Sequence, residues 1–355
     1  MKKILVAMSG GVDSAVAAYL IKSQGYDAGG ITMRVWFDGE VIGDSENTLP
    51  DSNCNDAKLI ADILKMPHYS VALGESFRTC VVDKFIEDYK NGLTPNPCVE
   101  CNKCIKFGKL FDMALSLNYD GIATGHYARI EKDLNGNYSL KKAADDAKDQ
   151  SYFLWSIDKN KLPYIKLPLG EYTKPQVREI AESQGFSNAH RSDSQDICFI
   201  NDGDYASFIA AHSSLSFPSG DFLDVEGNKV GTHGGIIHYT VGQRKGLGVA
   251  FGIPMFVKGK DAKLNTVTLS TNEQLFDTEL TAKRINLLTD VSFETPIRVQ
   301  AKIRYRHTPA IATVVRTDED TVNVKFDIPQ RAIAPGQSVV FYDGDTVIGG
   351  GIISQ

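Results

Sequence analysis

The sequence predicts an α/β protein in which a parallel-sheet domain is followed by a small mixed α+β module and a C-terminal β-barrel. Residues 1–130 alternate short apolar runs with helical patterns, which is typical of βαβ units. After about residue 203, glycine and histidine become frequent and turns separate short strands. From residue 276 onward the strands alternate clearly, which suits a small barrel or sandwich. We therefore predict domains over residues 1–202, 203–275 and 276–355.

The first domain carries the predicted parallel strands and the helices that connect them. Apolar runs predict strands at residues 4–8, 31–37, 69–73 and 121–124. Helical spacing predicts helices at residues 14–22, 58–65, 77–89 and 105–117. Asn135-Gly136 predicts a hairpin turn between two further short strands. The run Thr173-Lys174-Pro175-Gln176 predicts a capped helix that ends at Gly185.

The two later parts are divided by turns. Glu226-Gly227-Asn228 and Asp343-Gly344 are typical turn sequences, and residues 242–248 form a glycine-rich loop that contains Arg244 and Lys245. In residues 297–306 apolar and basic or polar side chains alternate, so a strand would carry its basic groups on one face. This face predicts contact with RNA, and a solvated barrel surface is the alternative. For Arg244 and Lys245 the alternative to RNA contact is positioning of the domains.

Composition excludes several classes of protein. The chain has 355 residues, 42% apolar residues and a formal net charge of -6, which is ordinary for a globular protein and argues against a non-specific binder of polyanions. No apolar run approaches the ~18 residues of a transmembrane helix, and the N-terminal run is too short for a signal peptide. We expect a cytoplasmic protein without membrane contact, whose six cysteines stay reduced.

The strongest local motif is the run Ser-Gly-Gly-Val-Asp-Ser at residues 9–14. It joins a predicted strand to a predicted helix, where glycines let the backbone approach a ligand and helix amides face an anion. Asp13 would order the loop or help to hold Mg²⁺. The run lacks the lysine of a Walker loop, and it resembles the PP-loop of the ATP pyrophosphatases (adenine nucleotide alpha hydrolase-like domains). An ordinary strand-to-helix turn is the alternative.

Four cysteines form a second candidate site. Cys98, Cys101 and Cys104 are spaced by two residues each, and Cys198 lies far along the chain at a polar-to-apolar junction. We predict a helix start near Cys101, which together with Lys103 and Lys106 would lower the pKa of that thiol. Two thiols brought together could carry a persulfide and close a disulfide. The alternatives are an iron–sulfur site with all four cysteines as ligands, or a buried core role for Cys198.

Motifs along the whole chain resemble the tRNA-specific 2-thiouridylase family, sulfurtransferases that convert the wobble uridine of certain tRNAs to 2-thiouridine. The motifs that carry this resemblance lie at residues 9–14, 96–97, 101–102, 105–107, 124–129, 148–154, 197–200, 239–248, 304–306 and 334–337.

The resemblance implies the chemistry and the site residues. ATP would adenylate the C2 oxygen of the wobble uridine, and sulfur from a persulfide would then replace it, which gives AMP and pyrophosphate. Cys101 would be the nucleophile, and Cys198 would carry a persulfide received from a sulfur-donor protein, with a transient disulfide between the two. The implied ATP contacts are Ala7, Met8, Ser9, Gly10, Gly11, Val12, Asp13, Ser14, Met33 and Gly125. The implied contacts with the target base are Asn96, Pro97 and Cys98. The expected tRNA contacts are His126, Lys148, Asp149, Gln150, Arg304, Tyr305, Arg306 and Gln337.

The chain also departs from the family pattern. Many members have Asp at the position of Cys98 and a residue other than cysteine at the position of Cys104. An acid–base role of that Asp does not pass unchanged to a thiol, because a free thiol titrates near ~8.5. The additional thiols keep one alternative open, an RNA-binding iron–sulfur module that only holds ATP. A second alternative is a different PP-loop ligase, which would explain residues 9–14 but leave Cys101 and Cys198 unused.

Overall fold

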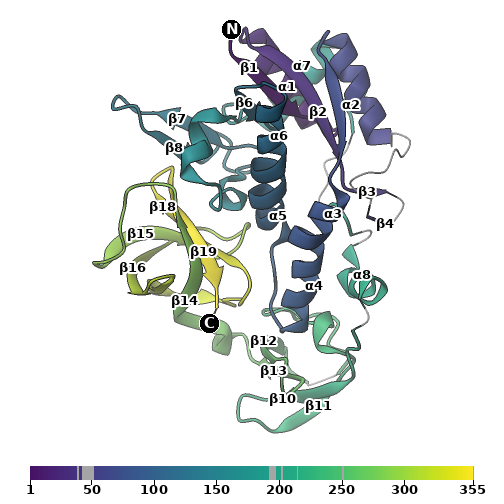
Figure 1. The fold of residues 1–355 in the computed structure, drawn as a ribbon. Helices are drawn as coiled ribbons and strands as arrows, with labels where there is room; N and C mark the ends of the chain where they lie inside the picture. Colours follow the sequence, from purple (N-terminus) through teal and green to yellow (C-terminus); the bar gives the residue numbers. More distant parts are fainter. Residues whose placement is uncertain are drawn as a thin grey trace.

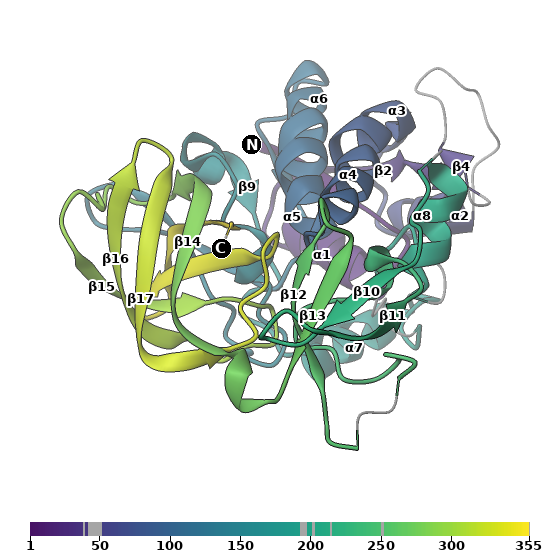
Figure 2. The same ribbon diagram turned by 90° about the horizontal axis from the view of Figure 1, so that it is seen from below.

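The protein is described by a computed structural model over residues 1–37, 40–41, 52–191, 197–200, 203–213, 215–249 and 252–354. Figure 1 shows the three predicted parts: the parallel sheet with its helices, a small β-sheet below it, and a barrel beside the helices. Figure 2 gives the perpendicular view, in which the barrel and the small sheet lie next to each other. Within the described ranges, none of the helices combines the length and apolar character that crossing a bilayer requires.

The N-terminal sheet is parallel throughout and has the order β5-β2-β1-β6-β9. Its strands are β1 (Lys3–Ala7), β2 (Asp27–Arg34), β5 (His68–Ala72), β6 (Gly121–Ala123) and β9 (Ile165–Lys166). The helices α1 (Val12–Ser23), α2 (Ser52–Ile63) and α7 (Lys174–Ser183) share one apolar core with the sheet. Since β1 lies between β2 and β6, the segments that follow these three strands meet at one edge of the sheet.

Two further helical series are longer than predicted, and each joins α-helical and π-helical segments end to end. One series is α3 (Gly74–Phe77), the π-helix η1 (Arg78–Val82) and α4 (Asp83–Lys90). The other is α5 (Pro97–Glu100), the π-helix η2 (Cys101–Lys109) and α6 (Leu110–Ser116). The second series therefore starts eight residues before the predicted start at residue 105, since Pro97 sets the first helical turn.

The central module is a four-stranded sheet of order β11-β10-β13-β12. Its elements are α8 (Tyr205–His212), β10 (Gly220–Leu223), β11 (Lys229–His233), β12 (Phe256–Asp261) and β13 (Thr266–Ser270). The sheet mixes one parallel pairing, β10 with β13, with antiparallel pairings, as expected for an α+β module. It shares an apolar core with α4 and α8, so it is packed directly against the first domain.

The C-terminal part is a closed antiparallel barrel, because the first strand pairs with the last. Its strands are β14 (Phe276–Leu287), β15 (Ile297–Lys302), β16 (Ala310–Asp318), β17 (Thr321–Arg331), β18 (Ser338–Asp343) and β19 (Thr346–Ile353). Alternate residues of these strands fill the interior, and Phe293 and Phe341 stack edge to face there.

The predicted hairpin of the first domain belongs to the barrel sheet. β7 (Arg129–Lys132) and β8 (Tyr138–Lys141) pair with each other, and β8 continues the barrel sheet at β19 through Lys141 and Thr346. Figure 1 shows this hairpin beside β18. The sequence showed the turn but not its partner, because the pairing joins segments far apart in the chain.

Short elements complete the fold. They are β3 (Trp36–Phe37), β4 (Glu40–Val41), η3 (Ser151–Phe153), η4 (Lys159–Tyr164), η6 (Ile236–His238) and η7 (Glu273–Leu275). The capping box at the start of α7 forms as predicted, with Thr173 and Gln176 bonded to each other's backbone groups.

Candidate active site

The predicted phosphate loop follows β1 at the carboxyl edge of the parallel sheet. The Ser9 backbone N–H donates to Ser14 Oγ (3.1 Å), and Ser14 Oγ donates to the Gly11 carbonyl (3.0 Å). Gly10 has a φ of +75°, a left-handed conformation that favours glycine. The Asn188 amide donates to the Gly10 carbonyl at 2.9 Å from the buried side. The loop is therefore held by hydrogen bonds of the protein itself.

The N-terminus of α1 opens onto this loop. Gly11 is the N-cap residue, and no side chain in the described part of the chain caps the helix. Backbone N–H groups at a helix start lack intrahelical acceptors, and the helix dipole adds a partial positive charge. The end of α1 is therefore suited to bind an anion such as a phosphate group.

Asp13 connects the loop to a lysine that the sequence analysis did not find. Asp13 Oδ1 accepts hydrogen bonds from the Tyr127 hydroxyl and from Lys174 Nζ, both at 2.7 Å. Lys174 is the first residue of α7 and is only 7% exposed. The capping box placed Lys174 at a helix start, but nothing in the sequence indicated that this start lies at the loop. Asp13 therefore orders the loop, and its role toward Mg²⁺ stays a prediction.

The other predicted ATP residues lie on neighbouring strands. Ala7 ends β1, Met33 lies near the end of β2, and Gly125 follows β6, which pairs with β1. A Cβ on Gly125 would lie 2.9 Å from the Asp13 carbonyl carbon and 3.0 Å from the Ser14 nitrogen. Only glycine fits there without a shift of the loop. The fold brings these residues to one edge, and their contacts with ATP stay a prediction.

Cys98, Cys101 and Cys198 form a thiol cluster around one lysine. Cys98 lies in α5, Cys101 begins η2, and Cys198 comes from residues 197–200, while residues 192–196 before it lie outside the described residues. The Lys106 ammonium is close enough to each of the three thiols to favour its ionised form and lower its pKa. Cys198 in turn acts electrostatically on Cys98 and Cys101. Sulfur atoms from distant parts of the chain are thus brought to one place.

The prediction that Cys101 has a lowered pKa is wrong for this conformation. The helix starts at Pro97, so Cys101 lies beyond its first turn and not at its N-terminus. Burial raises the pKa of Cys101 to about 12, which outweighs the opposite effect of Lys106. Burial also raises the pKa of Cys98 and Cys198. Both residues are nevertheless exposed at the surface, so burial acts most fully on Cys101.

The Cys104 thiol acts electrostatically on Cys101, but the lysine that acts on Cys104 itself is Lys103 and not Lys106. Cys104 forms a hydrogen bond with Cys80, which together with burial raises the pKa of Cys104. Within the described ranges, no three side chains of His, Cys, Asp or Glu are grouped as metal ligands. The predicted four-cysteine ligand set is therefore not assembled in this conformation, and an iron–sulfur cluster stays a prediction.

His126 links the sheet edge to the thiol cluster. Its side chain is 7% exposed, and its Nδ1 and Nε2 atoms lie 2.7 Å from Thr124 Oγ1 and 3.3 Å from Lys106 Nζ. Burial, assisted by the Lys106 charge, holds the pKa of His126 well below its usual value, so the ring is neutral. In this conformation the imidazole is an internal group, and its contact with tRNA stays a prediction.

The barrel braces the segment that the resemblance places at the target base. Gln337 Nε2 donates to the Thr94 carbonyl at 2.8 Å, and the Thr94 N–H donates to the Pro335 carbonyl at 2.8 Å. Asn96 and Pro97 line part of a pocket of about 280 Å³ between α4 and the barrel. The barrel thus sets the position of the backbone that leads into residues 96–98. Base contacts of this segment and a tRNA contact of Gln337 stay predictions.

Asp149 and Gln150 form hydrogen bonds that stabilise the fold. The Asp149 carboxylate is 5% exposed and accepts hydrogen bonds from the Ala143 and Ser151 N–H groups, both at 3.1 Å. Gln150 Oε1 accepts from the Tyr127 N–H at 3.0 Å. These two side chains hold the connection before η3, and the tRNA contacts of residues 148–150 stay a prediction.

The basic strand is shorter than predicted. β15 ends at Lys302, so the expected alternation over residues 303–306 is wrong. Arg298, on the exposed face, forms a bidentate pair with Asp327 at 2.6 Å. The chain leaves the sheet after Lys302 because residues 303–307 form bends and a turn.

The turn after β15 directs Arg304 and Tyr305 into contacts within the protein. The Arg304 guanidinium donates to the carbonyls of Val241 and Ala332, so it ties the central module to the barrel. Tyr305 packs on Phe153 with ring centroids 4.5 Å apart. Arg306 is exposed. Contacts of Arg304, Tyr305 and Arg306 with tRNA stay predictions.

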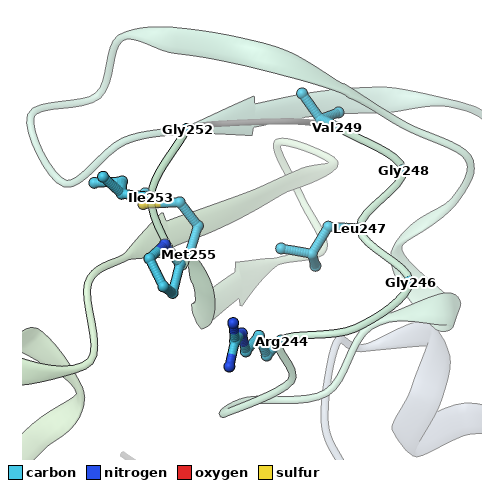
Figure 3. Close-up of a pocket in the computed structure, with 9 residues that line it drawn as sticks. Arg244, Gly246, Leu247, Gly248, Val249, Gly252, Ile253 and Met255 are labelled. Atoms are coloured by element: carbon cyan, nitrogen blue, oxygen red, sulfur yellow. The ribbon is translucent and has the colours of Figure 1, made fainter.

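The glycine-rich loop borders an open pocket of about 700 Å³ in the central module (Figure 3). Figure 3 shows Arg244 and Leu247 on the same stretch of chain, opposite Ile253 and Met255. Arg244 and Lys245 are exposed, whereas Val241 just before them accepts the Arg304 hydrogen bond at 2.9 Å. The residue directly before the loop therefore helps to hold the central module against the barrel, and RNA contact by Arg244 and Lys245 stays a prediction.

Comparisons with known proteins cover every part of the chain. Family models described as a tRNA methyl transferase HUP domain, a tRNA methyl transferase PRC-barrel domain and an aminomethyltransferase beta-barrel domain match residues 2–202, 206–271 and 277–353. A protein of Clostridioides difficile named tRNA-specific 2-thiouridylase MnmA is 48% identical over 100% of this chain and 98% of its own length. A protein of the same name from Lachnoclostridium phytofermentans is 44% identical over 99% of both chains.

The chain belongs to the tRNA-specific 2-thiouridylase family. The resemblance predicted from the motifs is thereby confirmed, and so is the predicted fold class. Among solved structures, a 4-thiouridine synthetase–RNA complex with bound ATP is 16% identical, with a TM-score of 0.34 over 59% of this chain and 50% of its own. That score is too low to support an argument, so the assignment to the 2-thiouridylase family rests on sequence identity over the full length.

Proposed function

We propose that this protein is a tRNA-uridine 2-sulfurtransferase, which uses ATP to replace the C2 oxygen of the wobble uridine by sulfur. The observation that carries the proposal is the joint placement of two parts. The phosphate loop and the thiol cluster are connected through consecutive residues, since Gly125 packs on the loop and His126 binds Lys106. Membership of the 2-thiouridylase family supports the same reaction.

The phosphate loop would bind ATP for the activation step. The C2 oxygen of uracil is a poor leaving group, and transfer of AMP to it creates a good one. The α1 amides and the Lys174 ammonium are suited to hold the phosphates, since one offers N–H donors and the other a fixed positive charge. Mg²⁺ would neutralise part of the phosphate charge, with Asp13 as the nearby carboxylate.

The thiol cluster would then deliver sulfur. A donor protein loads Cys198 with a persulfide, and the outer sulfur becomes bonded to C2 as AMP leaves with the C2 oxygen. The Cys101 thiolate attacks the Cys198 Sγ, and the bond between this atom and the outer sulfur breaks with its electron pair on the outer sulfur. The products are 2-thiouridine, AMP, pyrophosphate and a disulfide between Cys101 and Cys198. An external thiol reductant restores the two thiols.

The wobble base must leave the anticodon stack to reach this chemistry, which single-stranded loops allow at modest cost. Residues 96–98 would line the flipped base, and the segments at residues 148–150 and 304–306, with His126 and Gln337, would contact tRNA. We place the domain boundaries at residues 1–202, 203–275 and 276–355, a division supported by the three matching family models. Dependence on reduced thiols suits the cytoplasm.

The direct test is nucleoside mass spectrometry of unmodified tRNA incubated with the protein, ATP, Mg²⁺ and a persulfide donor. We expect 2-thiouridine with the wild type and none with Cys101→Ala or Cys198→Ala. Cys54→Ala is the matched control, since Cys54 is a buried cysteine of α2 outside the thiol cluster. Absence of 2-thiouridine with the wild type, including under anaerobic conditions with free sulfide, would overturn the proposal in favour of another PP-loop ligase.

A further inference from the structure

Lys106 connects the sheet edge to the thiol cluster. Its ammonium lies 3.3 Å from His126 Nε2, and the other ring nitrogen of His126 lies 2.7 Å from Thr124 Oγ1. Thr124 follows β6 directly and is itself buried, with its N–H donating to the Lys166 carbonyl at 3.2 Å. The ammonium is thus anchored to the parallel sheet through two side chains.

The roles of donor and acceptor in this chain follow from chemistry. An ammonium group has only donors, so His126 Nε2 must be the acceptor. A neutral imidazole carries one proton, which must then lie on Nδ1 and be donated to the Thr124 hydroxyl. His126 is neutral because it is buried beside a cation. The contact between Lys106 and His126 is therefore a charge-assisted hydrogen bond, and His126 holds the ammonium without neutralising it.

The π-helix directs Lys106 to the thiols. Residues 101–109 form η2, in which hydrogen bonds join residues five apart, so Cys101 and Lys106 lie one turn apart on one face. In an α-helix the same spacing would turn the two side chains away from each other. The charge of Lys106 also acts to lower the pKa of the Cys98 and Cys198 thiols.

The charges around the thiol cluster leave Lys106 as the group that opposes desolvation at all three thiols. Burial disfavours each thiolate, and the neighbouring thiols of Cys98, Cys104 and Cys198 disfavour it further at Cys101. Lys106 acts in the opposite direction on Cys98, Cys101 and Cys198 alike. Lys103, three residues earlier, acts on Cys104 instead.

We propose that Lys106 is a catalytic residue of sulfur transfer, whose ammonium pairs with the sulfur anion on Cys101 and on the departing outer sulfur, and that His126 and Thr124 are its positioning residues. This inference rests on the proposed function. The Cys101 thiol loses its proton to solvent before attack, and Lys106 keeps its three protons throughout. When the outer sulfur departs from Cys198 with its electron pair, the same ammonium lies beside the new negative charge.

The test separates activation from sulfur transfer. Lys106→Met should lower the rate of 2-thiouridine formation about 100-fold, the loss typical of removing one preorganised partner of a developing anion. Pyrophosphate release from ATP in the presence of tRNA should stay within about twofold, because the loop is untouched. Lys106→Arg, which keeps the charge, should form 2-thiouridine at least tenfold faster than Lys106→Met. Lys103→Met is the matched control on the same helix and should behave as the wild type.

Variants of His126 test whether it positions the Lys106 ammonium, because a purely structural role of His126 would not shift the pH profile of Cys101 alkylation. His126→Leu removes the acceptor of the ammonium, whereas His126→Gln keeps one in the amide oxygen. The rate of alkylation of Cys101 by iodoacetamide, followed against pH by peptide mass spectrometry, should shift to higher pH in Lys106→Met and in His126→Leu. It should return toward the wild-type profile in His126→Gln.

Two results would overturn the inference. One is 2-thiouridine formation by folded Lys106→Met within threefold of the wild type. The other is an equal loss of pyrophosphate release and sulfur transfer, which would assign Lys106 to activation. If the wild type itself makes no 2-thiouridine, the proposed function fails, and the alkylation profiles still decide whether Lys106 stabilises the thiolate. Unshifted profiles would then refute this inference too.

Discussion

The phosphate loop and the thiol cluster lie at the same edge of one sheet but are held in opposite ways. The loop is fixed by hydrogen bonds, both within the motif, as between Ser9 and Ser14, and from the distant side chains of Asn188 and Lys174. The thiols come from segments far apart, and burial raises the pKa of Cys101 to about 12, which keeps that thiol protonated. One half of the site is therefore ready for its ligand, whereas the other is assembled but held unreactive.

This difference suits the order of the proposed reaction. A thiolate exposed before tRNA binds would react with oxidants or release its sulfur, and a protonated thiol does neither quickly. Activation of the base by ATP carries no such hazard. We therefore expect changes at the loop to abolish activation of the base by ATP. Changes around the thiols should alter the rate of sulfur transfer.

The largest effect is expected from Lys174→Met, which removes the ion pair between Lys174 and Asp13 at the phosphate loop. The variant removes the cation that pairs with Asp13, whose side chain is 33% exposed and keeps the hydrogen bond from Tyr127. Pyrophosphate release should therefore fall at least 100-fold, and the free energy of unfolding by roughly 1–2 kcal/mol. Enzyme kinetics and urea denaturation measure these two quantities. Lys159→Met is the matched control, because Lys159 pairs with Asp290 on the exposed surface. Equal effects of both variants would contradict a role at the loop.

A second prediction concerns pH and tests whether the Cys101 thiol is buried. Below pH 9 the Cys101 thiol is protonated in both the folded and the unfolded chain, and above it only the unfolded chain ionises until the folded pKa of about 12 is reached. The stability of the wild type relative to Cys101→Ser should therefore be constant up to about pH 8.5. It should then fall with rising pH by up to about 1.4 kcal/mol per unit. Urea denaturation at pH 7.5 and pH 10 measures this, and a constant difference would mean that the thiol is not buried.

The smallest effect is expected from Ser338→Ala, which perturbs the barrel contact and leaves both halves of the site intact. Ser338 Oγ accepts from Trp155 Nε1 at 3.0 Å in a buried position, so the variant leaves an indole N–H without its acceptor. We expect a loss of roughly 1–2 kcal/mol in unfolding free energy. Ser354→Ala, whose hydroxyl bonds at the exposed surface, should change stability far less. Sulfur transfer per folded molecule should be unchanged in both variants.

Sequence reasoning predicted the features that depend on local patterns. The parallel sheet, the capping box at Thr173 and the turns at Asn135-Gly136 and Asp343-Gly344 follow from spacing and turn chemistry alone. The phosphate loop was found for the same reason, because all of its groups lie within residues 9–14.

Features that depend on distant contacts were missed. Lys174 reaches Asp13 from the far end of the domain, and no local pattern encodes that pair. The pKa of Cys101 was predicted in the wrong direction because burial, which needs the whole fold, outweighs the nearby lysine. The π-helical register that aligns Lys106 with Cys101 also has no known signature in a single sequence.

The pairing of β8 with β19 determines when this protein finishes folding. Leu140 of the hairpin packs in one apolar core with Val340 and Val347 of the barrel. On the ribosome the hairpin emerges long before those strands, so the nascent first domain carries an apolar face that nothing covers until the last strand is made. The packing of the first domain is therefore complete only when β18 and β19 have left the exit tunnel, and a chain cut before them would leave this apolar face open to chaperones.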